Sequence, residues 1–153
     1  MKRRTLIHAA MAAPSASLAA ALVVIPARLR ADWPTDAFHA EALMDAQQLL
    51  FGEREIEDSA RLVIDAPEIA ENGRNVPVEV RTDLAGLQSI TLLSDSNPSP
   101  LLARARFTPA AAPRLALRFK LGGSGNLIAI AEADGKLYRA VRPVKVTAGG
   151  CGG

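Results

Sequence analysis

The sequence has very little of the chemistry that builds metal sites or disulfide frameworks. Its 153 residues include one cysteine and two histidines, and only 4% are aromatic. A single cysteine excludes an internal disulfide, and so small a set of cysteine and histidine cannot by itself complete a zinc or copper site. With so few aromatic residues, the core must be built from Leu, Val, Ile and Ala.

A long uninterrupted hydrophobic run is also missing. The apolar stretch of residues 6–25 is broken by His8, Pro14, Ser15 and Ser17. These breaks make it too weak for a stable transmembrane helix.

The first 31 residues predict an export signal instead. The paired Arg3-Arg4 precede an Ala-rich, mildly apolar run, which is the pattern of a twin-arginine signal peptide. We expect cleavage after Ala31, with Ala27 as the alternative, and a periplasmic mature protein. No cysteine lies near either position, which excludes a bacterial lipoprotein.

The signal also accounts for the positive charge of the whole chain. It holds five of the 18 basic residues and none of the 16 acidic ones, so the mature chain has 13 basic residues and a net charge of about −3. Nucleic acid is therefore not an expected partner.

One helix and seven strands are predicted after the signal. Apolar spacings of three and four predict a helix over residues 35–50, capped by Thr35 or Asp36 and ended by Gly52. The charged stretch 53–59 is predicted to be a loop. From residue 61 the period becomes two, and turn residues separate the candidate strands 61–64, 76–81, 89–93, 102–108, 115–120, 127–132 and 137–146.

Short strands at this spacing predict a mainly β chain, an immunoglobulin-like antiparallel β-sandwich with one N-terminal helix. Asp134-Gly135 is the strongest hairpin signal, because a type I′ turn needs positive φ at both central positions. We therefore divide the chain into a signal peptide (1–31), a helix and linker (32–60), the sandwich (61–146) and a flexible arm (147–153).

The arm contains the one cysteine. Cys151 lies between two pairs of glycines, Gly149 and Gly150 before it and Gly152 and Gly153 after it. Ordering four glycines costs entropy that no contact here offsets, so we expect a mobile, exposed arm. If residue 146 ends the last strand, the sulfur can reach at most ~17 Å beyond it.

Catalysis by this thiol alone is not expected. A cysteine nucleophile needs a nearby base, and the only histidine of the mature chain, His39, lies more than a hundred residues upstream. The arm also has no helix N-terminus or cation to stabilise a thiolate. Activation must come from the surface that the arm enters, which favours a covalent carrier over an enzyme.

Three alternatives remain open for Cys151. It could form an intermolecular disulfide in a non-covalent β-sandwich assembly or binding module. It could pair with His39 in a thiol enzyme, or the tail could be an engineered labelling tag.

Basic residues on the predicted strands have two interpretations. The ordinary one is that they solvate exposed faces and protect edge strands. The functional one is a positive face for anionic adducts or acidic partners. These residues are Arg104, Arg106, Arg118, Lys120, Arg139, Arg142 and Lys145.

The glycine-flanked cysteine directly after a Val-Lys-Val strand resembles the tail of the SoxY sulfur carriers of bacterial thiosulfate oxidation. Three upstream segments are also similar to that family: residues 66–73 leading into Val76-Pro77-Val78, Asn97-Pro98-Ser99-Pro100, and residues 132–138. The similarity runs from residue 35 to the C-terminus and disfavours the labelling tag.

The resemblance implies an immunoglobulin-like subunit that works as a heterodimer with SoxZ, a second β-sandwich protein. It implies that the cysteine matching Cys151 is joined oxidatively to thiosulfate by a c-type haem enzyme. A hydrolase then releases sulfate and leaves sulfur on the thiol. The carrier itself catalyses nothing and needs no cofactor or metal. Some similar carriers serve other periplasmic oxidation systems, so the pathway is less defined than the carrier role.

Overall fold

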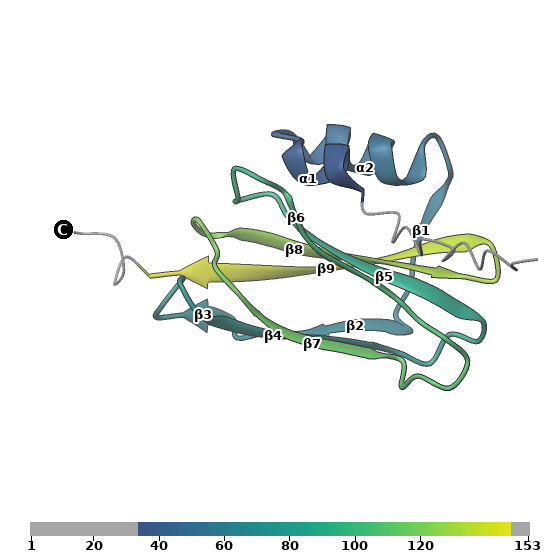
Figure 1. Ribbon diagram of the computed structural model, residues 1–153. Helices are drawn as coiled ribbons and strands as arrows, with labels where there is room; N and C mark the ends of the chain where they lie inside the picture. The colour runs from purple at the N-terminus through teal and green to yellow at the C-terminus, as the bar shows by residue number, and fades with distance from the viewer. Residues whose placement is uncertain (1–33, 148–153) are drawn as a thin grey trace, which may run out of the picture. The chain divides into compact units, whose positions relative to one another are not determined.

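The computed structural model describes residues 34–147, which fold into three layers: two short helices, a six-stranded sheet and a three-stranded sheet (Figure 1). The helices pack on one face of the larger sheet, and the smaller sheet packs on its other face. The predicted β-sandwich is confirmed, and it carries a helical layer.

The helical segment is broken into α1 (Thr35–His39) and α2 (Leu43–Phe51), so the prediction of one helix over 35–50 is wrong. Ala40 is extended, with φ −62° and ψ 136°, and interrupts the helix. The break lets both helices press a small side chain onto the sheet, since Ala37 and Ala46 are 2% and 0% exposed.

The helix start differs from the prediction, and the helix end agrees with it. Pro34 occupies the N-cap position without a side-chain hydrogen bond, so neither Thr35 nor Asp36 caps α1. Gly52 follows α2 with φ 63°, and its N–H donates to the Gln48 carbonyl at 2.9 Å. Glycine adopts this positive φ without a Cβ clash.

The six-stranded sheet has the order β1-β9-β8-β5-β6, with β3 also paired to β9. Its strands are β1 (Ile56–Asp58), β3 (Ile69–Ala70), β5 (Leu87–Ser94), β6 (Leu101–Arg106), β8 (Gly125–Ala133) and β9 (Lys136–Val146). β1 and β3 run parallel to β9, whereas the other pairs are antiparallel. β9 is therefore an interior strand.

The three-stranded sheet is antiparallel and has the order β2-β4-β7. Its strands are β2 (Leu62–Asp65), β4 (Val76–Thr82) and β7 (Arg114–Phe119). All seven predicted strands are confirmed, with ends within two residues of the prediction.

Two short strands, β1 and β3, were not predicted from the sequence. The predicted loop 53–59 is wrong at β1, and β3 lies in a segment where no strand was expected. Strands of three and two residues are too short to show a period of two. Both form by parallel pairing with β9, which is distant in the sequence.

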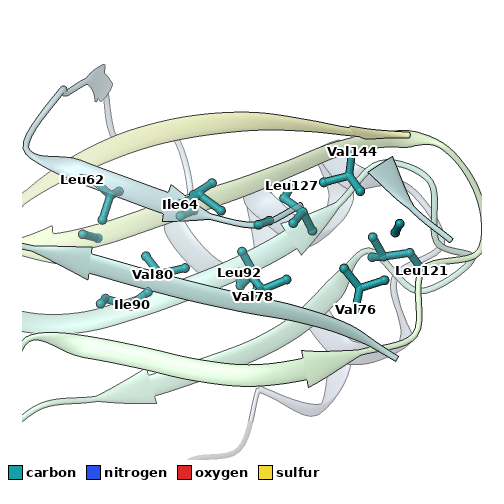
Figure 2. Packing of buried hydrophobic residues seen from close by; sticks show 14 of the residues in the cluster. Leu62, Ile64, Val76, Val78, Val80, Ile90, Leu92, Leu121, Leu127 and Val144 are labelled. Atoms are coloured by element: carbon teal, nitrogen blue, oxygen red, sulfur yellow. The ribbon is translucent and has the colours of Figure 1, made fainter. Parts of the chain in front are cut away.

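The main core lies between the two sheets and consists of aliphatic side chains (Figure 2). Buried and exposed residues alternate along β4, whose Val76, Val78 and Val80 point into this core. β5 and β8 instead have nearly continuous buried runs. The helices cover the face of these strands that the smaller sheet leaves open, so both faces need apolar residues.

The hairpin between β8 and β9 forms at Asp134-Gly135 as predicted. Asp134 has φ 48° and Gly135 has φ 76°, the positive values that a type I′ turn requires. Ala133 and Lys136 are paired directly across the turn.

An exposed ion pair orients β1 on β9. Asp58 accepts two hydrogen bonds from the Arg139 guanidinium, at 2.7 and 3.1 Å. These bonds lower the pKa of Asp58 and raise the pKa of Arg139 from their ordinary values. Because solvent screens exposed pairs, this contact sets geometry more than stability.

The turn before β4 brings Gly73 against the last residue of β9. A Cβ atom on Gly73 would lie 2.8 Å from Val146 Cγ1 and 3.0 Å from the Leu121 carbonyl oxygen. The Gly73 carbonyl also accepts the Leu121 N–H at 2.7 Å. Close approach, rather than an unusual φ, therefore requires glycine at this position.

Substitution of Gly73 tests this packing. We expect Gly73→Ala to lower the free energy of unfolding by about 1–3 kcal/mol, because the added methyl group must displace Val146 or the backbone at Leu121. Urea denaturation measures the change. Gly123→Ala is the matched control, since nothing lies within 4 Å of a Cβ there. Equal stability of the two variants would contradict the close approach.

Phe51 tests whether the helices unfold together with the sheets. Its side chain is 5% exposed and packs between α2 and the larger sheet. Phe51→Ala should lower the free energy of unfolding by about 3–5 kcal/mol. Met44, in the same helix, is 79% exposed. Met44→Ala should therefore change the free energy of unfolding by less than about 0.5 kcal/mol. If denaturation curves of the two variants coincide, the helical layer is not part of the cooperative unit.

Candidate functional site

Cys151 and the glycines beside it, Gly149, Gly150, Gly152 and Gly153, lie outside the described residues, as does the predicted signal. The structure describes the strand that leads to the cysteine as far as Thr147. β9 ends next to β3 (Figure 1). We define residues 145–147 as the arm root, and its geometry decides where the arm begins.

Backbone hydrogen bonds to β3 and the residue before it hold one edge of the arm root. The Lys145 N–H donates to the Glu68 carbonyl at 2.8 Å, and the Thr147 N–H donates to the Ala70 carbonyl at 3.1 Å. The chain is therefore held on this edge until four residues before Cys151.

A side chain holds the opposite edge. The Val146 N–H donates to the Ser124 hydroxyl oxygen at 2.9 Å, and the same hydroxyl donates to the Val146 carbonyl at 3.2 Å. The sequence pattern places Ser124 only among the turn residues between the candidate strands 115–120 and 127–132, and it does not predict a contact with Val146. A lone hydroxyl among three glycines is the available signal, but only the fold shows which strand it faces.

Two of the three upstream segments that resemble SoxY proteins surround the arm root. Residues 66–73 supply its β3 partners and the closely packed glycine. Asn97 accepts the Gly122 N–H at 2.7 Å and donates to the Lys120 carbonyl at 2.9 Å, which holds the turn beside the arm root. The third segment, 132–138, forms the hairpin at the opposite end of β9 (Figure 1).

His39, the histidine considered as a possible base, is exposed at the end of α1. Its Nδ1 lies 2.8 Å from the Thr35 carbonyl oxygen. A carbonyl only accepts, so Nδ1 carries the hydrogen and Nε2 is the basic nitrogen. Because Cys151 lies outside the described residues, a pair between it and His39 stays a prediction of the thiol-enzyme alternative.

The basic strand residues do not form a single edge-protecting set. Arg139, Arg142 and Lys145 lie on β9, an interior strand, so the edge-protection interpretation is wrong for them. Arg106 lies on β6 and Arg118 on β7. Among the described strands these are edge strands of their sheets, and both side chains are exposed as expected.

Arg104 also departs from the expectation of a solvated residue. Its side chain is 18% exposed, and its guanidinium carbon lies 5.6 Å from the centre of the Phe51 ring. Glu132 lies 3.8 Å from Arg104 and 2.7 Å from Arg54. Burial lowers the pKa of Arg104, and the charge of Glu132 opposes this shift. The cluster joins the end of α2 to the larger sheet.

Acidic side chains elsewhere on the domain form ion pairs with arginine side chains of other strands and turns. Asp83 lies 2.7 Å from Arg61, and Glu79 lies 3.1 Å from Arg114. Among residues 34–147, no three His, Cys, Asp or Glu side chains are grouped so that they could hold a metal ion. No helix in this part of the chain is long and apolar enough to cross a membrane.

Comparison with known proteins gives both a family and a fold. The profile of the family described as sulfur oxidation protein SoxY matches residues 47–151. The structure of the sulfur carrier protein SoxY from Chlorobium limicola f thiosulfatophilum is 44% identical, with a TM-score of 0.63, over 69% of this chain and 96% of that one. No curated protein matches the chain.

A superoxide reductase (neelaredoxin) from Ignicoccus hospitalis is similar to a smaller part of the chain. It is 26% identical, with a TM-score of 0.51, over 56% of this chain and 80% of that one. This likeness covers little more than half of the chain, whereas the SoxY profile continues as far as Cys151. The profile covers well over half of the chain, and the SoxY structure is matched over nearly its whole length. The family predicted from the sequence is confirmed: the chain belongs to the SoxY family of sulfur carriers.

Proposed function

We propose that this SoxY protein holds sulfur covalently on Cys151 and presents it to partner enzymes of sulfur oxidation in the periplasm. One observation carries the proposal: the match to the SoxY family runs as far as residue 151, which is the position of the cysteine. The sandwich supports it, because its last strand leads directly into the arm and is hydrogen-bonded on both edges.

The loading step would join two sulfur atoms. The Cys151 thiol loses its proton to solvent, and its sulfur bonds to the outer sulfur of thiosulfate while an electron pair passes to a c-type haem enzyme. A hydrolase then uses water to cleave the S–S bond between the attached sulfur and the sulfone group. The water oxygen leaves with the sulfone as sulfate, and the attached sulfur stays on Cys151 as a persulfide. In both steps the partner enzyme, rather than this chain, supplies the catalytic groups.

The arm root defines the reach of this carrier. Thr147 is the last residue with a hydrogen bond to the domain in the described part of the chain. The sulfur lies four residues further on, a distance of at most ~14 Å for an extended chain. Glycines on both sides of Cys151 keep the arm thin enough to enter a narrow channel in a partner.

Partners and compartment follow from the same proposal. SoxY proteins work with other Sox proteins. For this chain we infer a SoxZ-like subunit as heterodimer partner, together with the haem-containing conjugating enzyme and the sulfate-releasing hydrolase. Export by the twin-arginine signal in residues 1–31 would place the unpaired thiol where its reactions with partners occur.

Mass spectrometry tests the attachment site. After incubation with thiosulfate and the partner enzymes, we expect sulfur adducts confined to the C-terminal peptide, because Cys151 is the only thiol. Cys151→Ser is the matched control and should remain unmodified. A wild-type protein that stays unmodified under the same conditions would contradict the proposal.

Two other outcomes would favour the alternatives. If a disulfide-linked dimer on non-reducing electrophoresis is the sole functional form, the protein is an assembly module. If the isolated chain turns over substrate and loses this activity in His39→Ala, it is a thiol enzyme.

The glycines test the thin arm. Replacing Gly149 and Gly150 with Leu should leave the unfolding curve unchanged, since both residues follow the last strand, β9, which ends at Val146. The same change should lower turnover by the partner enzymes about tenfold or more, because bulky side chains obstruct a narrow channel. Replacing both glycines with Ala is the graded control and should have a smaller effect. Unchanged turnover in the Leu variant would remove the requirement for a thin arm.

A further inference from the structure

The last residues of β9 alternate between two kinds of hydrogen-bond partner. Lys145 and Thr147 direct their N–H groups toward β3 and the residue before it, where backbone carbonyls accept them. Val146 lies between them and directs its N–H and carbonyl to the other edge, toward β8. Neighbouring residues of a strand form hydrogen bonds on opposite edges, so each edge needs its own partner.

β8 cannot supply that partner with its backbone. Its first residue, Gly125, pairs with Val144, so Val146 lies beyond the end of the β8–β9 ladder. The Ser124 hydroxyl takes the place of the missing strand residue, since it accepts the Val146 N–H and donates to the Val146 carbonyl.

The turn that carries Ser124 is itself held in place from both ends. On one side, the Asn97 side chain accepts the Gly122 N–H at 2.7 Å. On the other side, Asp95 bonds the backbone N–H of Asn126 and, at 2.8 Å, its side-chain amide. Ser124 is therefore presented to β9 by a fixed turn rather than by a loose loop.

We propose that Ser124 is a positioning residue that locks the arm root, so that the chain leading to Cys151 is held in place as far as Thr147. What the arm carries rests on the proposed function, whereas the lock rests on the described contacts. A single hydroxyl completes the second edge, so its removal leaves the Val146 backbone without a hydrogen bond on the β8 side. The anchor of Cys151 then moves over a wider range, and the thiol spends less time where a partner can engage it.

Amide hydrogen exchange tests the lock without any partner enzyme. In Ser124→Ala we expect the Val146 amide to exchange about 5-fold faster, the effect of losing one net hydrogen bond. The Ala140 amide, which faces β8 from the middle of β9, should not change. Ser124→Thr keeps the hydroxyl and should restore slow exchange.

Ser59→Ala is the matched control for loss of a serine hydroxyl. The Ser59 hydroxyl also accepts a backbone N–H, from Arg61 at 3.3 Å, but far along the chain from the arm root. In this variant the Val146 amide should exchange at the wild-type rate. Unchanged exchange at Val146 in Ser124→Ala would overturn the lock, whatever Cys151 carries.

A kinetic measurement separates positioning from simple structural support. With the conjugating partner enzyme, Ser124→Ala should raise the KM for the carrier about threefold and leave kcat unchanged, since the partner holds the arm once it has entered. Ser124→Thr should recover the wild-type KM. Faster Val146 exchange with an unchanged KM would overturn the positioning role. Faster exchange in a protein whose Cys151 takes up no sulfur would overturn the proposed function and leave the lock in place.

Discussion

The backbone of β9 is hydrogen-bonded along both of its edges, and the other features of the site depend on this constraint. β8 pairs with one edge as an antiparallel hairpin partner, and β1 and β3 pair with the other edge in parallel. An interior strand cannot slip without breaking both ladders. The last strand of the domain therefore ends at a defined point, and the segment that follows starts from a fixed origin.

Burial on both faces of β5 and β8 explains why the domain needs a helical layer. The smaller sheet covers one face of these strands, and Ala37, Ala46 and Phe51 cover the other. Without the helices, Leu93 and Ile130, both fully buried, would face water. The Arg104 and Glu132 side chains at the margin of this layer are held between the helix end and the sheet.

The site combines a strand end held by hydrogen bonds with a glycine-rich sequence that contains the cysteine. Backbone bonds and the Ser124 hydroxyl hold the chain as far as Thr147, and glycine surrounds the only thiol beyond it. The described residues offer no grouped metal ligands, and His39 is their only histidine. Under the proposed function, this arrangement would present the Cys151 sulfur to a partner surface that activates it.

The sequence by itself determined the seven longer strands, the Asp134-Gly135 turn, the single cysteine among glycines and the family. These features are local, because a period of two, a positive φ and a short motif are each written in neighbouring residues. The tertiary structure alone decided the break at Ala40, the strands β1 and β3, the partial burial of Arg104 and the partner of Val146. The two strands, the burial of Arg104 and the partner of Val146 each depend on a residue far away in the chain. Ser124 shows the difference most clearly: its place among glycines predicts a turn, but its bonds to Val146 exist only because folding brings that turn to the end of the last strand.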